Sequence, residues 1–420
     1  MAAKKRGRVR GAIKVGVVGI GRGRTFMRGA KHGNMKLVAL CDNWEEPLAK
    51  FGAEYGVATY TKYEEFLKHD MDAVVLANFF HEHAPFAIQA LEAGKHVMSE
   101  CAACHTLAEG VALVRAVEKS GLTYMFAENY PYSACNQEMR RLYRKGHVGE
   151  FRYGEGEYVH PGTAEWRMSI SVGMDHWRNW IPATYYCTHS IAPVMYITDT
   201  WPVSVSAFVI PYDREDPAIN MTVRRGDLAA PMLLRMDNGA VMKSLHGGLR
   251  GHGNFVRIHG NRGLMESCRH GDRGMLRVHR EPFDKRRGEP TETVYKPDFP
   301  AHHEKAIRAG HAGGDFFTNY HFARAIRTGR PPFLDVYRGV AMSICGVQGW
   351  RSALAGGAPM EVPDFRGESA RRKYASDHWS PDPTRKGKKP PTSVLGKITP
   401  SRKAIALARK VWAAQRSTGV

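Results

Sequence analysis

The chain has 420 residues, of which 43% are hydrophobic, and a formal net charge of +20. This length allows two domains with buried cores. The sequence contains no run of eighteen apolar residues, so it predicts no membrane-spanning helix. The charge is uneven, because residues 366–420 carry +11 and residues 1–14 carry +6, which leaves the body of the chain nearly balanced. No nucleic-acid recognition motif accompanies the basic ends, so we expect a solvated or subunit-wrapping tail rather than a nucleic-acid-binding one.

The N-terminus and the cysteines indicate the cellular compartment. Residues 1–12 form a basic arm that leads into an apolar run without the apolar stretch of an export signal. The seven cysteines are irregularly spaced and do not suggest a disulfide framework. Both features predict a cytoplasmic, reduced protein. Cys101-Ala-Ala-Cys104 is a single C-x-x-C, which two ordinary thiols explain better than a redox or metal site.

The first strand pattern leads into a glycine-rich turn. Ile13–Val18 is apolar and rich in β-branched residues, and the residues that follow include Gly19, Gly21, Arg22, Gly23 and Arg24. A parallel strand that ends in such a turn lets a pyrophosphate approach the backbone at a helix N-terminus. The match is imperfect, because Arg24 holds the third glycine position and Gly23 is displaced by one. The alternative is an ordinary turn without a ligand.

An acidic residue ends the second strand pattern. Asp42 follows the apolar run 36–41, about twenty residues after the glycine turn, where a carboxylate can accept hydrogen bonds from ribose hydroxyls. A carboxylate would repel a 2′-phosphate, and Asn43 and Trp44 offer no guanidinium to bind one. The sequence therefore predicts NAD rather than NADP.

Strand and helix patterns alternate through residues 13–130. Short buried strands between helices predict a doubly wound parallel sheet, with strands at 13–18, 36–41, 73–77, 96–99 and 124–127 and helices at 84–93 and 107–119.

From about residue 150 the pattern changes to strands joined by turns such as Asp237-Asn-Gly239. It predicts an open, mostly antiparallel sheet with strands at 151–159, 203–210, 233–236, 241–245 and 256–259 and helices at 315–327 and 337–355. Residues 376–391 suggest an irregular linker before a last amphipathic helix. Thr399 is its predicted N-cap, Pro400 its first residue, and Leu407, Ala408, Val411 and Trp412 its apolar face. We thus expect an α/β chain with a Rossmann domain at 13–130, a substrate and oligomerisation domain at 131–365, and a basic tail at 366–420.

Several motifs together resemble the Gfo/Idh/MocA oxidoreductases, an NAD-dependent family with this two-domain plan. The resemblance is most specific at Asp72–Ala77, His83 and Ala90–Val97, which leads into Ser99-Glu100. Typical members continue Glu-Lys-Pro, where the lysine assists proton transfer beside the nicotinamide. This chain keeps Glu100 but has Cys101 and Ala102, and Tyr185 stands where typical members carry an Asp four residues before the catalytic His.

The remaining motifs resemble glycoside hydrolase family 109, the NAD-dependent glycosidases of this fold. The matching segments are Glu128-Asn129, Gly156-Glu-Tyr158-Val-His160, Tyr186-Cys-Thr-His189, Ile191–Val194, His311-Ala-Gly-Gly-Asp315, Asp335-Val-Tyr337 and Pro363-Asp-Phe365.

This resemblance implies a redox-neutral cleavage of a carbohydrate. NAD⁺ takes a hydride from a sugar C3, a base removes the acidified C2 proton, the glycosidic oxygen leaves, water adds and the hydride returns. His189, Tyr186 and Tyr158 are the implied catalytic residues, with His189 in proton transfer. The expected cofactor-binding residues are Gly19, Gly21, Arg22, Gly23, Arg24, Asp42, Asn78, His83, Glu100 and Asn129; the expected substrate-binding residues are Glu128, Trp177, Arg178, His311 and Asp315.

Two other functions remain open: a net sugar or polyol dehydrogenase that uses His189 alone, and a non-catalytic NAD-binding subunit. The segment 176–180 places Arg178 between two tryptophans, which suits stacking on a sugar with a charge-assisted bond to an anion. A packed aromatic cluster with a surface arginine explains the same pattern equally well. His81-Glu82-His83 superficially resembles a metal motif, but adjacent residues of one loop converge poorly on an ion, and we expect no metal. The open sheet and the tail suggest a homo-oligomer.

Overall fold

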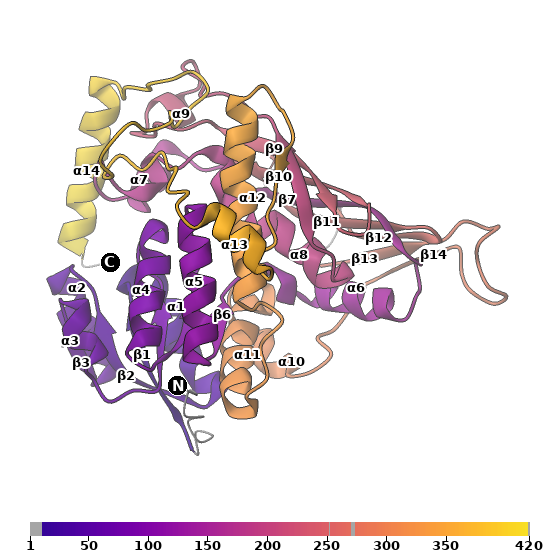
Figure 1. Cartoon of the computed structure of the whole chain (residues 1–420), viewed down its shortest axis with the longest axis horizontal. Helices are drawn as coiled ribbons and strands as arrows, with labels where there is room; N and C mark the ends of the chain where they lie inside the picture. The colour runs from indigo at the N-terminus through magenta and orange to yellow at the C-terminus, as the bar shows by residue number, and fades with distance from the viewer. Residues whose placement is uncertain (1–10, 252, 270–273, 419–420) are drawn as a thin grey trace.

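The computed structural model describes residues 11–251, 253–269 and 274–418. Most of the expected N-terminal arm therefore lies outside the described residues. Within the described ranges, no helix is both long enough and apolar enough to cross a bilayer. The chain forms two sheets with their covering helices, and the C-terminal segment runs back over both parts (Figure 1).

The first sheet is the predicted doubly wound parallel sheet. Its strand order is β3-β2-β1-β4-β5-β6, and all neighbours pair in parallel. The strands are β1 Ile13–Val18, β2 Met35–Cys41, β3 Ala58–Tyr60, β4 Ala73–Leu76, β5 His96–Ser99 and β6 Tyr124–Phe126. The prediction missed β3, because three residues give no readable alternation. The strand order reverses between β1 and β4, and ligands of such sheets bind at that switch point.

Short helices connect these strands and bury their apolar faces on the sheet. They are α1 Ile20–Gly29, α2 Glu45–Tyr55, α3 Tyr63–Leu67, α4 His83–Glu92 and α5 Leu107–Ser120. Thr106 caps α5 by accepting the Glu109 N–H at 3.1 Å, and Gly121 ends it with a φ of 63°. Both ends follow ordinary capping chemistry.

The second sheet is open and mostly antiparallel, as predicted. Its order is β14-β13-β12-β11-β7-β10-β9-β8-β15, and only β7 and β10 pair in parallel. The strands are β7 Phe151–Val159, β8 Pro202–Ala207, β9 Ala229–Met236, β10 Val241–Gly247, β11 Gly253–Gly260, β12 Gly263–Ser267, β13 Leu276–His279, β14 Glu292–Tyr295 and β15 Met360–Glu361. The sequence pattern did not reveal β12 to β15, which are two to five residues long.

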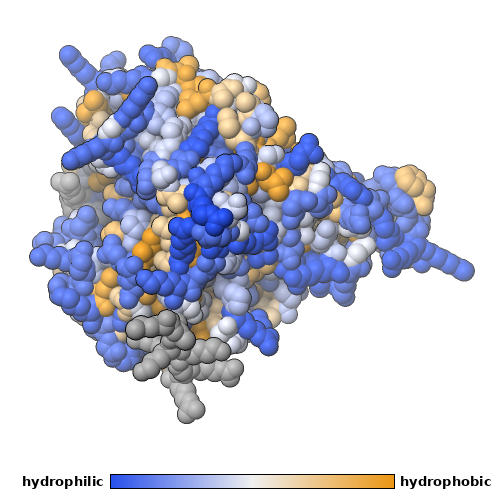
Figure 2. Space-filling view, in the orientation of Figure 1, coloured by the Kyte–Doolittle hydropathy of each residue, from blue (hydrophilic) through white to orange (hydrophobic). Residues whose placement is uncertain are grey.

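Helices cover one face of this sheet. α8 Thr188–Thr198 and α12 Val336–Leu354 contact its strands, and α6 Ala134–Arg144 packs on α8. In contrast, α11 Gly314–Thr328 packs against α1 of the first domain. Shorter helices are α7 Ala164–Ser169, α9 Pro217–Asn220 and α10 His303–Ala306. The other face carries ion pairs such as Lys243 with Glu155 at 2.8 Å and Arg269 with Glu157 at 2.9 Å. The side of the molecule in view in Figure 2 is likewise mostly hydrophilic, with apolar residues in small groups.

The end of the tail packs on its own chain, so the expectation of a solvated segment was wrong, whereas subunit wrapping stays a prediction. After α13 Glu368–Tyr374, an extended stretch leads to α14 Arg402–Thr418, which lies beside α7 (Figure 1). Ala408 is buried against Met168, and the Trp412 indole donates to the Met168 carbonyl at 3.0 Å. The helix starts two residues later than predicted, because the Ser401 hydroxyl accepts the Ala404 N–H at 3.0 Å and thereby serves as the N-cap.

Candidate active site

A cleft of about 1660 Å³ lies at the carboxyl edge of the parallel sheet and is closed on its other side by the second domain. Of the predicted site residues, fifteen line it: Gly19, Gly21, Arg22, Arg24, Asp42, Asn78, His83, Glu100, Asn129, Tyr158, Trp177, Arg178, Tyr186, His189 and His311. Gly23, Glu128 and Asp315 are not among its lining residues. The fold therefore brings together most side chains that the sequence singled out.

The glycine turn has the geometry of a phosphate cradle. Gly19 has a φ of 83°, and a Cβ there would lie 2.4 Å from the backbone of Ala77. A Cβ on Gly21 would meet no atom within 4 Å, so this position leaves open space beside the first turn of α1. Gly23 allows α1 to approach β1, because its Cβ would lie 2.8 Å from Val17. The displaced third glycine thus performs the packing role, and Arg24 does not disturb the turn.

Unsatisfied polar atoms in the cleft fit a dinucleotide. The side-chain oxygens of Asn78 and Asn129 are buried and have no hydrogen-bond partner within the described structure. Asp42 accepts the N–H groups of Ile20 at 2.8 Å and Trp44 at 2.9 Å, and a carboxylate has further lone pairs for hydroxyl donors. Burial raises the pKa of Asp42. The turn, the two amides and the acid together match the donors and acceptors of NAD.

His83 contacts two loops at the glycine-turn side of the cleft. Its Nδ1 lies 2.9 Å from the carbonyl oxygen of Ala102, and its Nε2 lies 3.3 Å from that of Asn78. Burial lowers the pKa of this imidazole. The ring therefore ties the loop after β4 to the loop after β5.

The centre of the site is a histidine held by a buried carboxylate. His189 Nδ1 lies 2.7 Å and 2.8 Å from the two oxygens of Glu128. Burial alone would raise the pKa of Glu128, but the adjacent imidazole and its hydrogen bond keep that pKa below the ordinary value. Because Nδ1 is engaged, Nε2 is the ring nitrogen available to the cleft. Glu128 was expected to hold sugar hydroxyls; instead its side chain is fully buried and orients His189.

Three tyrosines surround this imidazole. The ring centroids of Tyr158, Tyr186 and Tyr130 lie 4.6, 4.8 and 4.8 Å from that of His189. Tyr186 ends a 3₁₀ turn, Ala183–Tyr186, and His189 lies in the first turn of α8, so they do not share one helix. Burial raises the pKa of both Tyr158 and Tyr186, which therefore remain protonated donors at neutral pH.

The thiol of Cys101 completes the surroundings of Glu128. Its Sγ lies 3.1 Å from a Glu128 oxygen, and burial together with the Glu128 charge raises the thiol pKa well above its usual value. Cys101, Glu128 and His189 each place a ligand-type atom within 4.8 Å of the others. Both neighbours donate to the carboxylate. We therefore interpret the group as a hydrogen-bonded support for the imidazole.

A second polar network lies on the other side of the cleft. Arg22 pairs with Glu100, and its other nitrogen lies 3.4 Å from Asp315. Asp315 also accepts from Asn129 at 2.9 Å and from His311 Nδ1 at 2.7 Å. Asp315 is nearly fully buried, so it positions its three neighbours rather than facing the cleft itself.

Sequence reasoning missed Tyr130 and the role of Cys101. Tyr130 directly follows Glu128-Asn129 at the carboxyl end of β6, and that position was the available signal for it. For Cys101 no local signal existed, because its partner Glu128 lies 27 residues away in the sequence.

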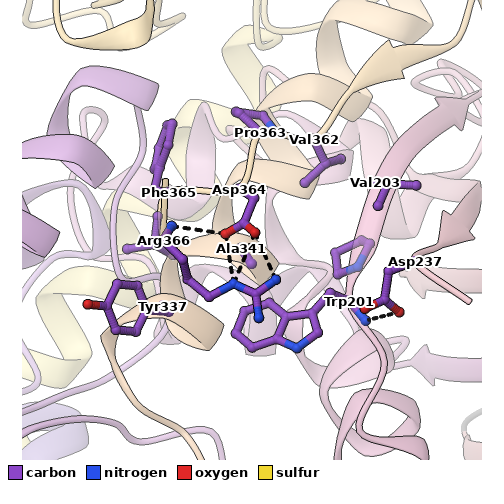
Figure 3. Close-up of a pocket in the computed structure, with 12 residues that line it drawn as sticks. Trp201, Val203, Asp237, Tyr337, Ala341, Val362, Pro363, Asp364, Phe365 and Arg366 are labelled. Carbon is purple, nitrogen blue, oxygen red and sulfur yellow. Dashed lines mark hydrogen bonds and ion pairs between the residues drawn. The ribbon is translucent and has the colours of Figure 1, made fainter. Parts of the chain in front are cut away.

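A separate pocket of about 140 Å³ shares no lining residue with the cleft. Arg366 lies over the Trp201 ring at 4.0 Å and is hydrogen-bonded to Asp364 (Figure 3). The family segments 335–337 and 363–365 contribute Tyr337 and Phe365 to this pocket, so these motifs serve packing away from the cleft.

Comparison with known proteins agrees with this architecture. Residues 13–128 match the oxidoreductase family with an NAD-binding Rossmann fold, and residues 136–371 match the glycosyl hydrolase 109 C-terminal domain. A glycosyl hydrolase family 109 protein of Solibacter usitatus is 27% identical, with 84% of this chain and 88% of the relative covered. A second such protein, of Phocaeicola vulgatus, is 26% identical, with 84% of each chain covered.

Solved structures share the fold. Levoglucosan dehydrogenase in complex with NADH and L-sorbose superposes with a TM-score of 0.71 at 19% identity, covering 84% of this chain and all of that one. Aldose-aldose oxidoreductase from Caulobacter crescentus gives a TM-score of 0.65 at 21% identity, covering 83% and 99% of the two chains. The family segments, the matched domains and the cleft agree: this chain has an NAD-binding Rossmann domain of the Gfo/Idh/MocA type and belongs to glycosyl hydrolase family 109.

Proposed function

We propose that the protein is an NAD-dependent glycosidase that cleaves its substrate without net redox change. The observation that carries the proposal is the His189–Glu128 pair, which presents one imidazole nitrogen to a cleft shared by the glycine turn and three tyrosines. NAD, when bound at the glycine turn, supplies the reversible hydride transfer that this chemistry needs. Family membership supports a glycoside as the substrate.

The residues of the chain supply the proton transfers. We assign to His189 Nε2 the removal of a proton from the sugar, because Glu128 holds Nδ1 as the donor and stabilises the imidazolium that results. Tyr186 and Tyr158 keep their protons at neutral pH and are suited to donate to a hydroxyl or to the leaving oxygen. Trp177 and Arg178 contribute an aromatic and a charged surface to the same cleft.

The second candidate is a net sugar dehydrogenase. Its support is the likeness to levoglucosan dehydrogenase, whose structure contains NADH and a sugar, although this likeness establishes the fold alone. In this chain Cys101 stands where the family's dehydrogenases carry a lysine, and its thiol supports Glu128 instead. The third possibility is a non-catalytic NAD-binding subunit. It would not explain why the cleft contains the His189–Glu128 pair.

One assay separates these functions. The purified protein is incubated with a panel of p-nitrophenyl glycosides and catalytic NAD⁺, while nitrophenol release and NADH absorbance are followed together. Cleavage without accumulation of NADH supports the glycosidase, and cleavage in D₂O should place deuterium at C2 of the released sugar. Stoichiometric NADH without cleavage would establish the dehydrogenase. If His189→Gln left every detected activity unchanged, the assignment of His189 would be wrong.

A further inference from the structure

The two walls of the cleft carry opposite charge. The wall formed by residues 18–130 has more acidic than basic residues. The six acidic ones are Asp42, Glu45, Glu46, Glu64, Glu82 and Glu100, and the three basic ones are Arg22, Arg24 and Lys62. Among the described lining residues from 151 onward there is no aspartate or glutamate, but there are three arginines: Arg167, Arg178 and Arg224. The substrate side of the cleft is therefore lined with positive charge; the carboxylate of the buried Asp227 acts on Arg224 but does not line the cleft.

Neutral groups hold these arginines in place. The Arg178 guanidinium lies 4.2 Å from the centre of the Trp177 ring and 5.6 Å from that of Tyr186. Arg167 donates to the carbonyl oxygen of His160, and Arg224 donates to that of Gly226 at 3.1 Å. In the described part of the chain, no carboxylate oxygen lies within 4 Å of these three side chains. Arginines elsewhere do have such partners, for example Arg250 with Asp216 at 2.7 Å.

The three charges lie close enough to oppose one another. Burial and the neighbouring Arg178 lower the pKa of Arg167. Burial and Arg167, partly offset by the carboxylate of Asp227, lower the pKa of Arg224 to about 10. Keeping partly buried cations together is unfavourable unless an anion compensates them. A guanidinium binds an oxyanion with a planar pair of N–H donors, so the compensating group best suited to this wall is a carboxylate, sulfate or phosphate.

We propose that the substrate of this cleft is a glycoside whose sugar carries an anionic group, bound by Arg178 with Arg167 and Arg224 behind it. Arg178 lies beside Tyr186, whose ring is 4.8 Å from His189, so the anionic group would be bound next to the reacting sugar rather than at the glycine turn. The inference rests on the proposed carbohydrate function and narrows its substrate class.

Calorimetric binding to the NAD-loaded protein tests the proposal with matched pairs. The probes are D-glucuronate and D-glucose, D-galacturonate and D-galactose, glucose 6-phosphate and glucose, and N-acetylglucosamine 6-sulfate and its parent, with inorganic phosphate and sulfate alone. We expect at least one charged sugar to bind tenfold or more tightly than its neutral parent and than the free anion. This preference should disappear in Arg178→Gln, persist in part in Arg178→Lys and weaken as salt is raised.

The control variant is Arg235→Gln, which removes one positive charge from an exposed position of β9 outside the cleft. It should keep the preference of the wild type. The proposal is overturned if no charged sugar exceeds its neutral parent, if free phosphate or sulfate binds as tightly as the sugar, or if Arg178→Gln keeps the preference. It is also overturned if Arg178→Gln weakens only NAD binding, because the arginine would then serve the cofactor.

A parallel measurement of nitrophenol release distinguishes failure of the anionic subsite from failure of the glycosidase proposal. Selective binding of a charged sugar without cleavage of any glycoside would refute the glycosidase and leave the anionic subsite standing. Cleavage of neutral glycosides without any preference for charged sugars would refute the anionic subsite and leave the glycosidase standing.

Discussion

Replacement of Glu128 by glutamine tests the central pair of the site with almost no change of shape. The Glu128 side chain is fully buried and lies within 2.8 Å of His189 Nδ1 through both oxygens. Glutamine keeps one acceptor for that N–H but removes the negative charge, and its amide nitrogen would face the thiol of Cys101, 3.1 Å from the present oxygen. Charge-assisted hydrogen bonds are about twice as strong as neutral ones.

The loss of this charge determines how far kcat is expected to fall. A hydrogen bond to a charged group contributes about 1.5–3 kcal/mol and a neutral one about 1 kcal/mol, so the difference is about 0.5–2 kcal/mol. If His189 becomes positively charged during the reaction, kcat should fall by roughly 2- to 30-fold in Glu128→Gln, because each 1.36 kcal/mol is tenfold in rate. KM should change little, because Glu128 does not line the cleft.

Glu109→Gln is the matched control. Glu109 is a second shielded glutamate paired with a histidine, His105 Nδ1 at 2.7 Å, and it does not line the cleft. Steady-state kinetics and urea unfolding are measured for both variants. Both should lose stability, but only Glu128→Gln should lose turnover. Equal effects on kcat in the two variants would refute the assigned role of Glu128.

Three further outcomes are expected. Gly21→Ala should remain folded but weaken NAD binding at least tenfold in a fluorescence titration, because its methyl group would occupy the open space of the cradle, whereas Gly19→Ala should impair folding through its contact with Ala77. Trp412→Ala should lower the free energy of unfolding in urea by about 1–3 kcal/mol, since it removes a partly buried ring and the bond to Met168. The folded-state pKa of Glu128 is depressed, so its stabilisation is complete above the ordinary value of 4.5 and is lost as the pH falls through the folded pKa. The stability difference between wild type and Glu128→Gln should therefore shrink as the pH falls below about 4.5.

Each of these has a contradicting result. Unchanged NAD affinity in Gly21→Ala would mean that the cofactor does not approach this turn. An unaffected unfolding midpoint in Trp412→Ala would mean that α14 does not stabilise the fold. A stability difference that grows as the solution is acidified would show that the Glu128 carboxylate is not stabilised in the folded state.

Local sequence patterns sufficed for the parallel sheet and its glycine turn. A buried β-branched run that ends in glycines or an acid predicts a strand followed by a turn. This prediction works because the preference for a strand or a turn depends on residues that are neighbours in the sequence. Gly19 and Asp42 could be found in this way, whereas His189 was identified through the family resemblance. The short outer strands β12 to β14 could not be found in this way, because their exposed side chains form ion pairs across the sheet and leave little apolar alternation to read. The strand β15 has only two residues, too few for any pattern.

Only the tertiary structure determined the partners within the site. Glu128 and His189 are 61 residues apart, and Arg22 meets Asp315 across 293 residues, so no spacing rule relates them. Tertiary structure likewise brings Arg167, Arg178 and Arg224 to one side of the cleft from separate segments. The basic composition of the tail suggested exposure, but Ala408 and Trp412 pack on α7. Composition and periodicity describe one element at a time, whereas the charge that a buried group meets depends on which elements the fold brings beside it.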